Sequence, residues 1–345
     1  MDWPTISVVV LNYNGKHHLQ ACLTSLLALD YPAEQHEILV VDNASADGSA
    51  DFVREQFPTV RLIQNQENIG FAAGNNRGAQ EARGRYVVFL NNDTRVDSQF
   101  LRELVKPCLA QPDVVCTAAK ILDWDGQRVD FVSSAMNFHA FAFQRNIGDQ
   151  DTYHEQRPLL FACGGAMLIQ RDIFLDSGGF DEDYFIYFED LDLGWRLWLM
   201  GFRVMFVPTA MVYHRLHATM NAFSDFRKWV LFERNALITL LKNYGEESLD
   251  KTLPTALLLM FKRAARFMRA GGWNPQSYYI RDRRATTYTD SVNRSGLAVI
   301  VAAEEVVDNL SKVYEKRAKA QALRRRSDAD IFAMLGQPLR SHTIL

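Results

Sequence analysis

The first half of the chain alternates short runs of mostly apolar, β-branched residues with segments of helical period. The apolar runs are typical of strands buried on both faces, and they are Ile6–Leu11, Glu37–Val41, Val60–Ile63 and Tyr86–Leu90. The helical segments between them are His18–Leu29, Ser49–Phe57 and Gly74–Ala82. This order predicts an α/β fold in which helices flank a mostly parallel sheet. Such sheets bind their ligands beyond the carboxyl ends of the strands.

The rest of the chain divides into a less regular middle and a helical end. Further helices are expected at residues 100–110, Glu189–Met200 and Phe226–Tyr244, and strands at Gly164–Gln170 and Arg203–Val207, where Pro208 ends the strand. Residues 122–160 predict loops and short strands. After Gly245 the pattern is helical, with a polar interruption around residues 271–296. We therefore expect an α/β domain over residues 1–245 and a helical, basic region over residues 246–345.

Charge is distributed unevenly between these two regions. Residues 251–345 carry 17 Lys and Arg against 8 Asp and Glu, whereas residues 1–250 carry 21 against 33. On the predicted helix Leu257–Arg269, one face holds Leu257, Phe261, Ala264 and Met268, and the opposite face holds Lys262, Arg266 and Arg269. A basic amphipathic helix can lie at a membrane surface, but a helix packed on the α/β domain with a solvated basic face fits equally well. No aromatic-interleaved basic motif indicates nucleic acid as a partner.

The cysteines and the apolar runs indicate a cytoplasmic protein. The four cysteines form no C-x-x-C pair and no zinc spacing, so we expect them to be reduced. The sequence begins Met1-Asp2-Trp3-Pro4 without the charged segment that opens a secretory leader. No apolar run approaches the roughly 20 residues that span a bilayer.

Three predicted strands are followed by clusters that could carry chemistry. Asp42–Ser49 offers a carboxylate to a ribose hydroxyl or a base N–H, although the same residues suit a turn that caps a helix. Asn68–Gly78 is a Gly-rich segment, but it matches neither the G-x-G-x-x-G nor the P-loop pattern. Asn91–Thr94 is rich in oxygen ligands, which suit Mg²⁺ or Mn²⁺ shared with substrate phosphates. An ordinary Asn/Asp turn is the alternative.

A fourth cluster, Asp181–Asp192, crowds carboxylates among aromatic residues at a predicted helix start. The helix N-terminus stabilises anions, whereas apolar surroundings raise a carboxylate's pKa, and together these suit a general base. Asp192 and Arg196 are four residues apart and can pair on the helix. His214 follows a strand and could complete a metal site, although a lone histidine is more often structural.

Taken together, these clusters resemble the family 2 glycosyltransferases of the GT-A fold, and more specifically their rhamnosyltransferase-like branch. The resemblance covers about residues 4–245 and rests on Ser7–Gly15, Val40–Ser45, Asn68–Asn75, Phe89–Asp93 and Gly178–Asp181 followed by Glu189–Asp192. The order and spacing of these stretches are more specific than any one of them. The family's Asp-x-Asp metal motif is represented here by Asn91-Asn92-Asp93, with Asn in the first position.

The resemblance implies roles for individual residues. The donor would be bound by Asn12, Asn14, Asp42, Asn43, Asn68, Gly70, Phe71, Asn75, Asn91, Asn92 and Gly165, with Asp42 at the nucleotide base. Asp93 and His214 would bind Mg²⁺ or Mn²⁺. Asp190 would be the general base, with Glu189 and Asp192 shaping the acceptor site.

The implied reaction is an inverting transfer of a sugar from a nucleoside-diphosphate donor to a hydroxyl of a glycan or lipid-linked acceptor, in cell-surface polysaccharide synthesis. Rhamnose from dTDP-rhamnose is the first donor expected. Peripheral contact with the inner face of the cytoplasmic membrane would suit a lipid-linked acceptor. A nucleotidyltransferase would need Arg and Lys in the first loop, and Ile6–Gly15 has neither; a nicotinamide-dependent oxidoreductase would need G-x-G-x-x-G. A non-catalytic module that binds a nucleotide sugar or glycan remains the alternative.

Overall fold

The computed structural model describes residues 3–144, 146–215, 225–269 and 294–336. The strands of its main sheet are β1 (Ile6–Asn12), β2 (His36–Asp42), β3 (Arg61–Gln64), β4 (Tyr86–Asn91), β5 (Thr94–Val96), β6 (Val114–Asp123), β7 (Val129–Phe131), β10 (Arg157–Leu159), β11 (Ala166–Gln170) and β12 (Arg203–His214). The order across the sheet is β10-β12-β6-β11-β4-β1-β2-β3, with β5 beside β12 and β7 beside β6. A separate hairpin joins β8 (Ser134–Met136) to β9 (Ala142–Gln144).

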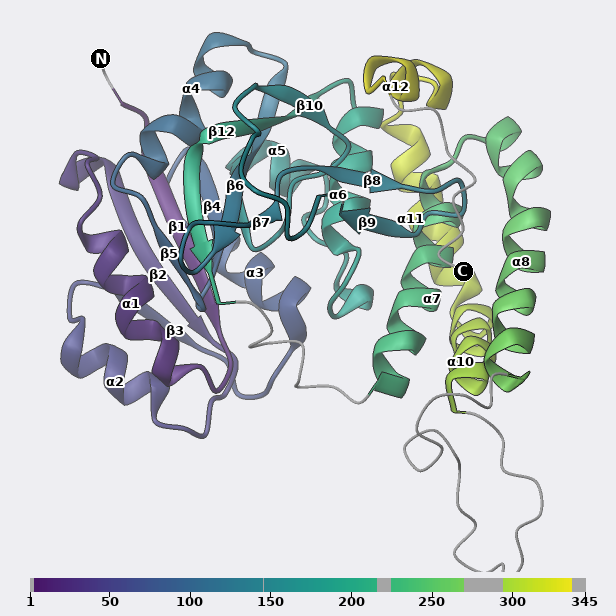
Figure 1. The fold of residues 1–345 in the computed structure, drawn as a ribbon, viewed down its shortest axis with the longest axis horizontal. Helices are drawn as coiled ribbons and strands as arrows, with labels where there is room; N and C mark the ends of the chain where they lie inside the picture. Colours follow the sequence, from purple (N-terminus) through teal and green to yellow (C-terminus); the bar gives the residue numbers. More distant parts are fainter. Residues whose placement is uncertain (1–2, 145, 216–224, 270–293, 337–345) are drawn as a thin grey trace, which may run out of the picture.

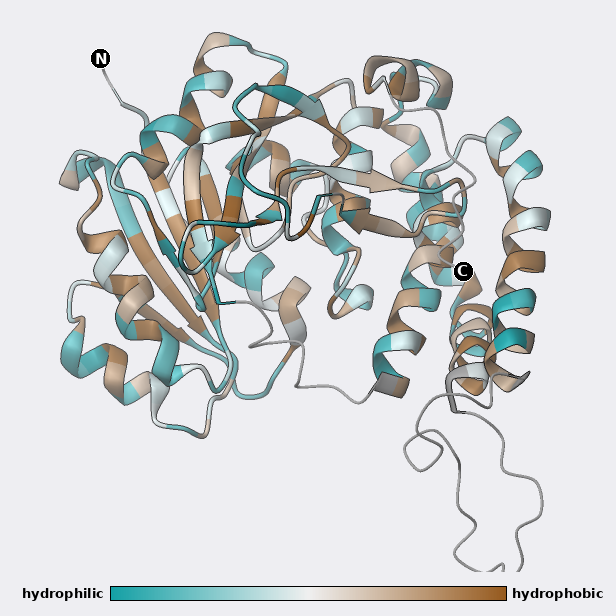
Figure 2. Ribbon diagram, in the orientation of Figure 1, coloured by the Kyte–Doolittle hydropathy of each residue, from teal (hydrophilic) through white to brown (hydrophobic). Residues whose placement is uncertain are grey.

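The predicted α/β fold with a mostly parallel sheet is confirmed. β1 lies between β2 and β4 with all three strands parallel, and β6 and β12 form a second parallel pair. β11 joins the two groups and runs antiparallel to both of its neighbours. The central strands are apolar over most of their length, as Figure 2 shows, because both faces of the sheet are covered.

Helices cover the sheet and continue beyond it. They are α1 (Lys16–Leu27), α2 (Ser49–Gln56), α3 (Gly70–Glu81), α4 (Phe100–Ala110), α5 (Arg171–Asp176), α6 (Glu189–Leu199), α7 (Asp225–Asn243), α8 (Glu246–Arg269), α10 (Arg294–Asp308), α11 (Leu310–Ala322) and α12 (Asp328–Met334). Short 3₁₀ turns occupy Ala33–Gln35 and Glu182–Tyr184. α1 and α2 lie at one end of the molecule, and α7, α8, α10 and α11 stand together at the other (Figure 1).

The C-terminal helices contribute residues to the main apolar core around the sheet, and they also form a smaller core among themselves. Tyr244 and Ile331 belong to the main apolar cluster, which also contains the fully buried Trp195 and Trp198 of α6. A second, smaller cluster is buried among α7, α8 and α10; it consists of Val230, Met260, Ala264, Ala298, Val299 and Ala302. The helical C-terminal part is therefore confirmed, while the division of the chain into domains at residue 245 stays a prediction.

Several elements differ from the sequence prediction. α3 begins at Gly70 rather than Gly74, so part of the predicted Gly-rich loop is the first turn of a helix. β12 continues through Pro208 to His214, because a register shift between Val207 and Met211 accommodates the proline. β6, for which no strand was predicted, pairs with both β11 and β12.

The basic tail also differs in detail. On α8 the buried residues are Ala256, Met260 and Ala264, whereas Leu258 and Phe261 are 69% and 66% exposed. Of the predicted apolar face, Ala264 is therefore buried, whereas Phe261 and Met268 are exposed. Arg324 and Arg326 donate to the carbonyls of Asn243 and of Gly201 and Phe202, so these cations hold the tail on the α/β part. The predicted polar interruption at 271–296 lies mostly outside the described residues.

Candidate active site

Asparagine side chains join the carboxyl ends of β1, β2 and β4. Asn12 Nδ2 donates to Asp42 Oδ1 at 2.9 Å, and Asn92 Nδ2 donates to Asn12 Oδ1 at 2.7 Å. Asn12 and Asp42 are register partners in the parallel pair of β1 and β2. The predicted convergence of the strand-end clusters is thus a direct result of parallel pairing.

The Asp42 carboxylate organises the loop after β2. Ser45 donates through its N–H to Oδ2 at 3.0 Å and through Oγ to Oδ1 at 2.6 Å. Asn14, at φ 51°, donates its N–H to Ser45 Oγ at 2.8 Å and accepts from Ala46 N at 2.8 Å. Asp42 is 1% exposed. A carboxylate has about four acceptor positions, so a position on Oδ2 remains for a ligand.

A second amide network attaches the start of α3 to β2. Asn43 Nδ2 donates to Asn68 Oδ1 at 3.2 Å and to the Gly70 carbonyl at 3.0 Å. Asn75 Nδ2 donates to the Phe71 carbonyl at 3.0 Å. Gly70 has φ 86°, and a Cβ there would lie 2.6 Å from the Phe185 ring, so only glycine allows this approach. Asn43, Asn68, Gly70, Phe71 and Asn75 thus form one structural unit.

Asp93 and His214 come together from different strands. His214 Nε2 lies 3.2 Å from Asp93 Oδ1, and His214 Nδ1 lies 2.6 Å from Asp130 Oδ2 on β7. Burial alone would lower the pKa of His214, but its hydrogen bonds to the two carboxylates raise that pKa to about 10. Within the described ranges, no group of three or more His, Cys, Asp or Glu side chains is arranged to hold a metal ion.

The dipeptide Gly164-Gly165 links these strand ends to the predicted base. Asn91 N donates to the Gly165 carbonyl at 2.9 Å, and a Cβ on Gly165 would lie 2.8 Å from Asn91 Nδ2. On the other side, Gly164 N donates to Asp190 Oδ2 at 3.3 Å. The donor candidate Asn91 and the base candidate Asp190 therefore both contact this dipeptide, which contains the predicted site residue Gly165.

Asp190 and Glu189 are two carboxylates in an apolar setting. Burial raises the pKa of Asp190 to about 6, against hydrogen bonds from Gly164 N and Leu191 N that lower it. Burial and the neighbouring Asp190 charge raise the pKa of Glu189 well above its ordinary value. Glu189 is 5% exposed, and its Oε2 has no hydrogen-bond partner among the described residues, whereas Asp190 is part exposed. The pair can hold and exchange a proton near neutral pH.

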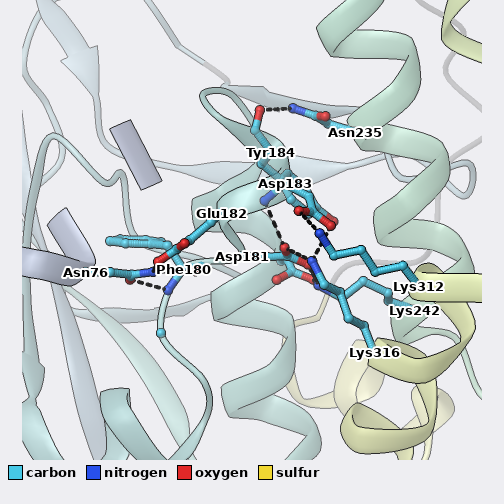
Figure 3. A network of polar contacts seen from close by, with 12 residues as sticks. Asn76, Phe180, Asp181, Glu182, Asp183, Tyr184, Asn235, Lys242, Lys312 and Lys316 are labelled. Carbon is cyan, nitrogen blue, oxygen red and sulfur yellow. Dashed lines mark hydrogen bonds and ion pairs between the residues drawn. The ribbon is translucent and has the colours of Figure 1, made fainter. Parts of the chain in front are cut away.

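Asp192 faces a different environment. It is fully buried; its Oδ2 lies 2.8 Å from Arg196 Nη2, which confirms the predicted pair, and its Oδ1 lies 3.0 Å from Lys242 Nζ. Burial would raise the pKa of Asp192, but these two cations keep it below its ordinary value. Asp192 thus belongs to a network of ion pairs, which Figure 3 shows around Asp181, rather than to the surface beside Asp190.

The network behind Asp190 joins the α/β part to the C-terminal helices. Lys242 of α7 lies 2.5 Å from Asp181, and Lys316 of α11 contacts both Asp181 and Asp183 (Figure 3). Sequence reasoning missed Lys242 and Lys316, which lie on helices with no motif around them. It also missed Asp130, which lies in the irregular middle of the chain; no local signal separates it from other turn residues there.

Comparison with known proteins agrees with the fold. The family described as Glycosyl transferase family 2 matches residues 7–178. A relative from Mycobacterium tuberculosis, N-acetylglucosaminyl-diphospho-decaprenol L-rhamnosyltransferase, is 30% identical in an alignment of 240 residues that covers 62% of this chain and 77% of that protein.

Two solved structures share the fold at low sequence identity. S. aureus TarS 1–349 in complex with UDP-GlcNAc has a TM-score of 0.58 at 18% identity, covering 97% of this chain and 93% of TarS 1–349. GalNAc-T7 with UDP, GalNAc and Mn²⁺ has a TM-score of 0.58 at 19% identity, covering 78% of this chain and 52% of that one.

Proposed function

This chain belongs to glycosyltransferase family 2, and we propose that it transfers a sugar, with inversion at the anomeric carbon, from a nucleoside diphosphate to a hydroxyl of a lipid-linked glycan. The observation that carries the proposal is the part-exposed Asp190, whose raised pKa of about 6 leaves it mostly ionised, and so able to accept a proton, near neutral pH. A general base works best when its pKa lies near the operating pH.

In this mechanism the proton of the acceptor hydroxyl passes to Asp190. The acceptor oxygen attacks the anomeric carbon opposite the diphosphate, which leaves in a single displacement and inverts the configuration. One carboxylate suffices for this step, whereas a retaining hydrolase uses a second carboxylate as nucleophile. Glu189, the residue before Asp190, is buried, and this burial together with the Asp190 charge raises its pKa well above the ordinary value.

The donor nucleotide is assigned to the linked strand ends. Asn12, Asn14 and Asp42 form a rigid edge at β1 and β2, and the remaining acceptor position on Asp42 suits a base N–H or a ribose hydroxyl. The start of α3, held by Asn43 and Asn68, forms the neighbouring wall. Hydrogen bonds within this edge fix its shape before the donor arrives, which lowers the entropic cost of binding.

Asp93 and His214 would hold a divalent cation of the Mg²⁺ or Mn²⁺ type once the cation replaces the proton that the two neighbouring carboxylates favour on the imidazole. The Asp93 carboxylate and the His214 imidazole lie 3.2 Å apart, and Asp130 binds the second ring nitrogen. Histidines that ligate metals are commonly oriented by an outer partner of this kind. Two protein ligands suit a cation that shares its coordination with substrate phosphates. When bound, the cation supplies positive charge against the diphosphate leaving group.

Rhamnose is the sugar proposed for the donor, because the mycobacterial relative is an L-rhamnosyltransferase. The same name supports a polyprenyl-diphosphate-linked acceptor and a role in cell-envelope polysaccharide synthesis. None of the described helices is long and apolar enough to cross a bilayer. We therefore propose peripheral contact with the membrane through the exposed Leu258, Phe261 and Lys262 of α8, where apolar side chains adjoin a cation.

The test is donor binding and transfer across UDP-, GDP- and dTDP-sugars with Mg²⁺ or Mn²⁺. We expect one donor to bind in a metal-dependent manner, and Asp190→Asn to lower kcat about 10²–10⁴-fold while donor affinity is retained. Asp93→Ala should weaken metal-dependent donor binding instead. Binding of no nucleotide sugar at any metal concentration would reject the proposed reaction.

The membrane contact has its own test. In flotation with vesicles that contain anionic lipid, the wild type should float with the vesicles and Phe261→Glu should not. The control Leu109→Glu, at an exposed apolar residue on α4, should bind the vesicles as the wild type does. Equal retention of both variants would reject α8 as the contact.

A further inference from the structure

The segment that leads into Glu189 and Asp190 has a strained backbone. Phe185, Tyr187 and Phe188 have φ values of 63°, 72° and 66°, which residues other than glycine rarely adopt. At Phe185, with ψ −58°, the chain makes a three-residue turn in which Ile186 N donates to the Tyr184 carbonyl at 2.7 Å. Strain of this kind persists only where surrounding structure holds it, and it gathers at functional sites.

Helix α7 holds this segment through Asn235. Its Nδ2 donates to the carbonyls of Ile186 and Tyr187 at 3.0 and 2.7 Å, and it lies 3.2 Å from the Tyr184 carbonyl. Figure 3 shows Asn235 reaching the turn from its helix. Asn235 is fully buried, so no water can replace these contacts.

Arg234 reinforces the same hold. Its Nη2 donates to the carbonyls of Asp183 and Tyr184 at 2.8 and 3.1 Å, and Glu305 of α10 fixes the guanidinium from behind at 2.9 Å. Two adjacent side chains of α7 thus bind the carbonyls of a segment about 50 residues earlier in the chain. A sequence motif around either residue would not reveal this contact.

The other side of the strained segment meets the donor wall. The Phe185 carbonyl accepts from Phe71 N at 2.7 Å and from Ala72 N at 3.2 Å, at the start of α3. The Phe185 ring packs on Gly70, where a Cβ has no room. The segment 185–188 therefore connects the α3 wall proposed for the donor with the proposed base Asp190, which lies two residues after the segment ends.

We propose that Asn235 is a positioning residue for sugar transfer: it holds segment 185–188 in its strained form, so that Asp190 and the start of α3 keep the separation that the reaction requires. The proposal rests on the proposed function and extends it to the C-terminal helices. Asn235 is fully buried, and it acts through the carbonyls of Ile186 and Tyr187. Its loss should therefore change the chemical step more than donor binding.

The experiment compares Asn235→Ala with Asn309→Ala under steady-state kinetics. Asn309 Nδ2 likewise donates to a backbone carbonyl, that of Glu305 at 2.8 Å, but far along the chain from the strained segment. We expect kcat of Asn235→Ala to fall about 10–100-fold, as for a misplacement of about 1 Å, with donor KM changed less than about threefold. Asn235→Ser, which keeps one donor, should recover part of kcat. Asn309→Ala should match the wild type.

Two outcomes overturn the inference: kcat of Asn235→Ala equal to that of the control, or a loss confined to donor KM. If thermal unfolding shows that Asn235→Ala does not fold, Arg234→Gln is used for the same test. This substitution removes hydrogen bonds to the neighbouring carbonyls, and the Arg234 side chain is less buried than that of Asn235. Absence of transfer by the wild type on every donor would instead reject the proposed function, so the two failures are distinguishable.

Discussion

The donor edge and the base-bearing segment are built in opposite ways. At the donor edge, neutral amides such as Asn12, Asn43 and Asn92 link neighbouring strand ends, and Asp42 is the carboxylate among them. Around the base, buried charges dominate: Lys242 lies between Asp181 and Asp192 with all three side chains nearly inaccessible. The first region is held by sheet pairing, the second by helices that come much later in the chain.

This difference indicates how each region can fail. The donor edge inherits its geometry from the parallel register of β1, β2 and β4, so the loss of one amide leaves the strands in place. The base segment depends on contacts from α7 and α11, so the loss of one charge leaves others buried and unpaired. Mutations should therefore act on ligand affinity in the first region and on stability or turnover in the second.

The largest expected effect is on stability, from Lys242→Met. Removing this cation leaves Asp181 and Asp192 buried with fewer partners, and we expect a loss of about 3–5 kcal/mol in the free energy of unfolding at pH 7. Both carboxylates have lowered pKa values in the fold, so the stability that they contribute is present above about pH 4 and is lost as pH falls.

Urea unfolding at pH 7 and pH 3 measures this effect, and the difference between Lys242→Met and the wild type should shrink at pH 3. Lys251→Met is the matched control, because Lys251 pairs with Glu247 on an exposed surface. Equal stability of both variants at pH 7 would remove the contrast between the two regions.

The second effect concerns pH and turnover. Asp190, with its pKa raised to about 6 by burial, must be ionised to accept a proton, so kcat should fall about tenfold per pH unit below that value. Donor binding, measured separately by calorimetry, should not share this midpoint. A kcat that is flat from pH 5 to pH 8 would contradict the assignment of Asp190.

A smaller effect is expected at the donor edge, from Asn12→Ala. The substitution removes hydrogen bonds to Asp42 and Asn92. Their loss should weaken donor binding by about 1–2 kcal/mol and so raise the donor KM roughly tenfold. kcat at saturating donor should stay within about threefold of the wild type, and thermal unfolding separates this effect from a loss of fold. A fall in kcat with unchanged donor KM would mean that this edge acts on the chemical step, and the comparison would no longer hold.

The smallest effect is expected from Lys312→Met. Lys312 pairs with Asp183 at the exposed margin of the same ion network that contains Lys242, with 54% of its side chain accessible. An exposed pair contributes about 0–1 kcal/mol, so unfolding and turnover should both be close to those of the wild type. A loss of stability comparable with that of Lys242→Met would show that the contribution of an ion pair in this network does not depend on its burial.

Local sequence patterns were sufficient for the framework of the α/β part. The runs Ile6–Leu11 and Tyr86–Leu90 are apolar because both faces of these strands are covered, and this pattern depends on no distant residue. The Asn/Asp clusters that follow these strands were identified as candidates, and parallel pairing brings the strand ends to one edge of the sheet. Asn91-Asn92-Asp93 and Glu189-Asp190 were also identified as candidates from the chain alone.

Tertiary structure decided which candidates share a surface and what holds them. Asp192 has the same residue type and helix as Asp190, and its pair with Arg196 was predicted from their spacing, but only the docking of α7 brings Lys242 to it. Asn235 and Asp130 have no motif, because their roles come from carbonyls and an imidazole more than 40 residues away. Periodicity determines local conformation, but contacts between distant helices depend on packing that no short stretch of sequence encodes.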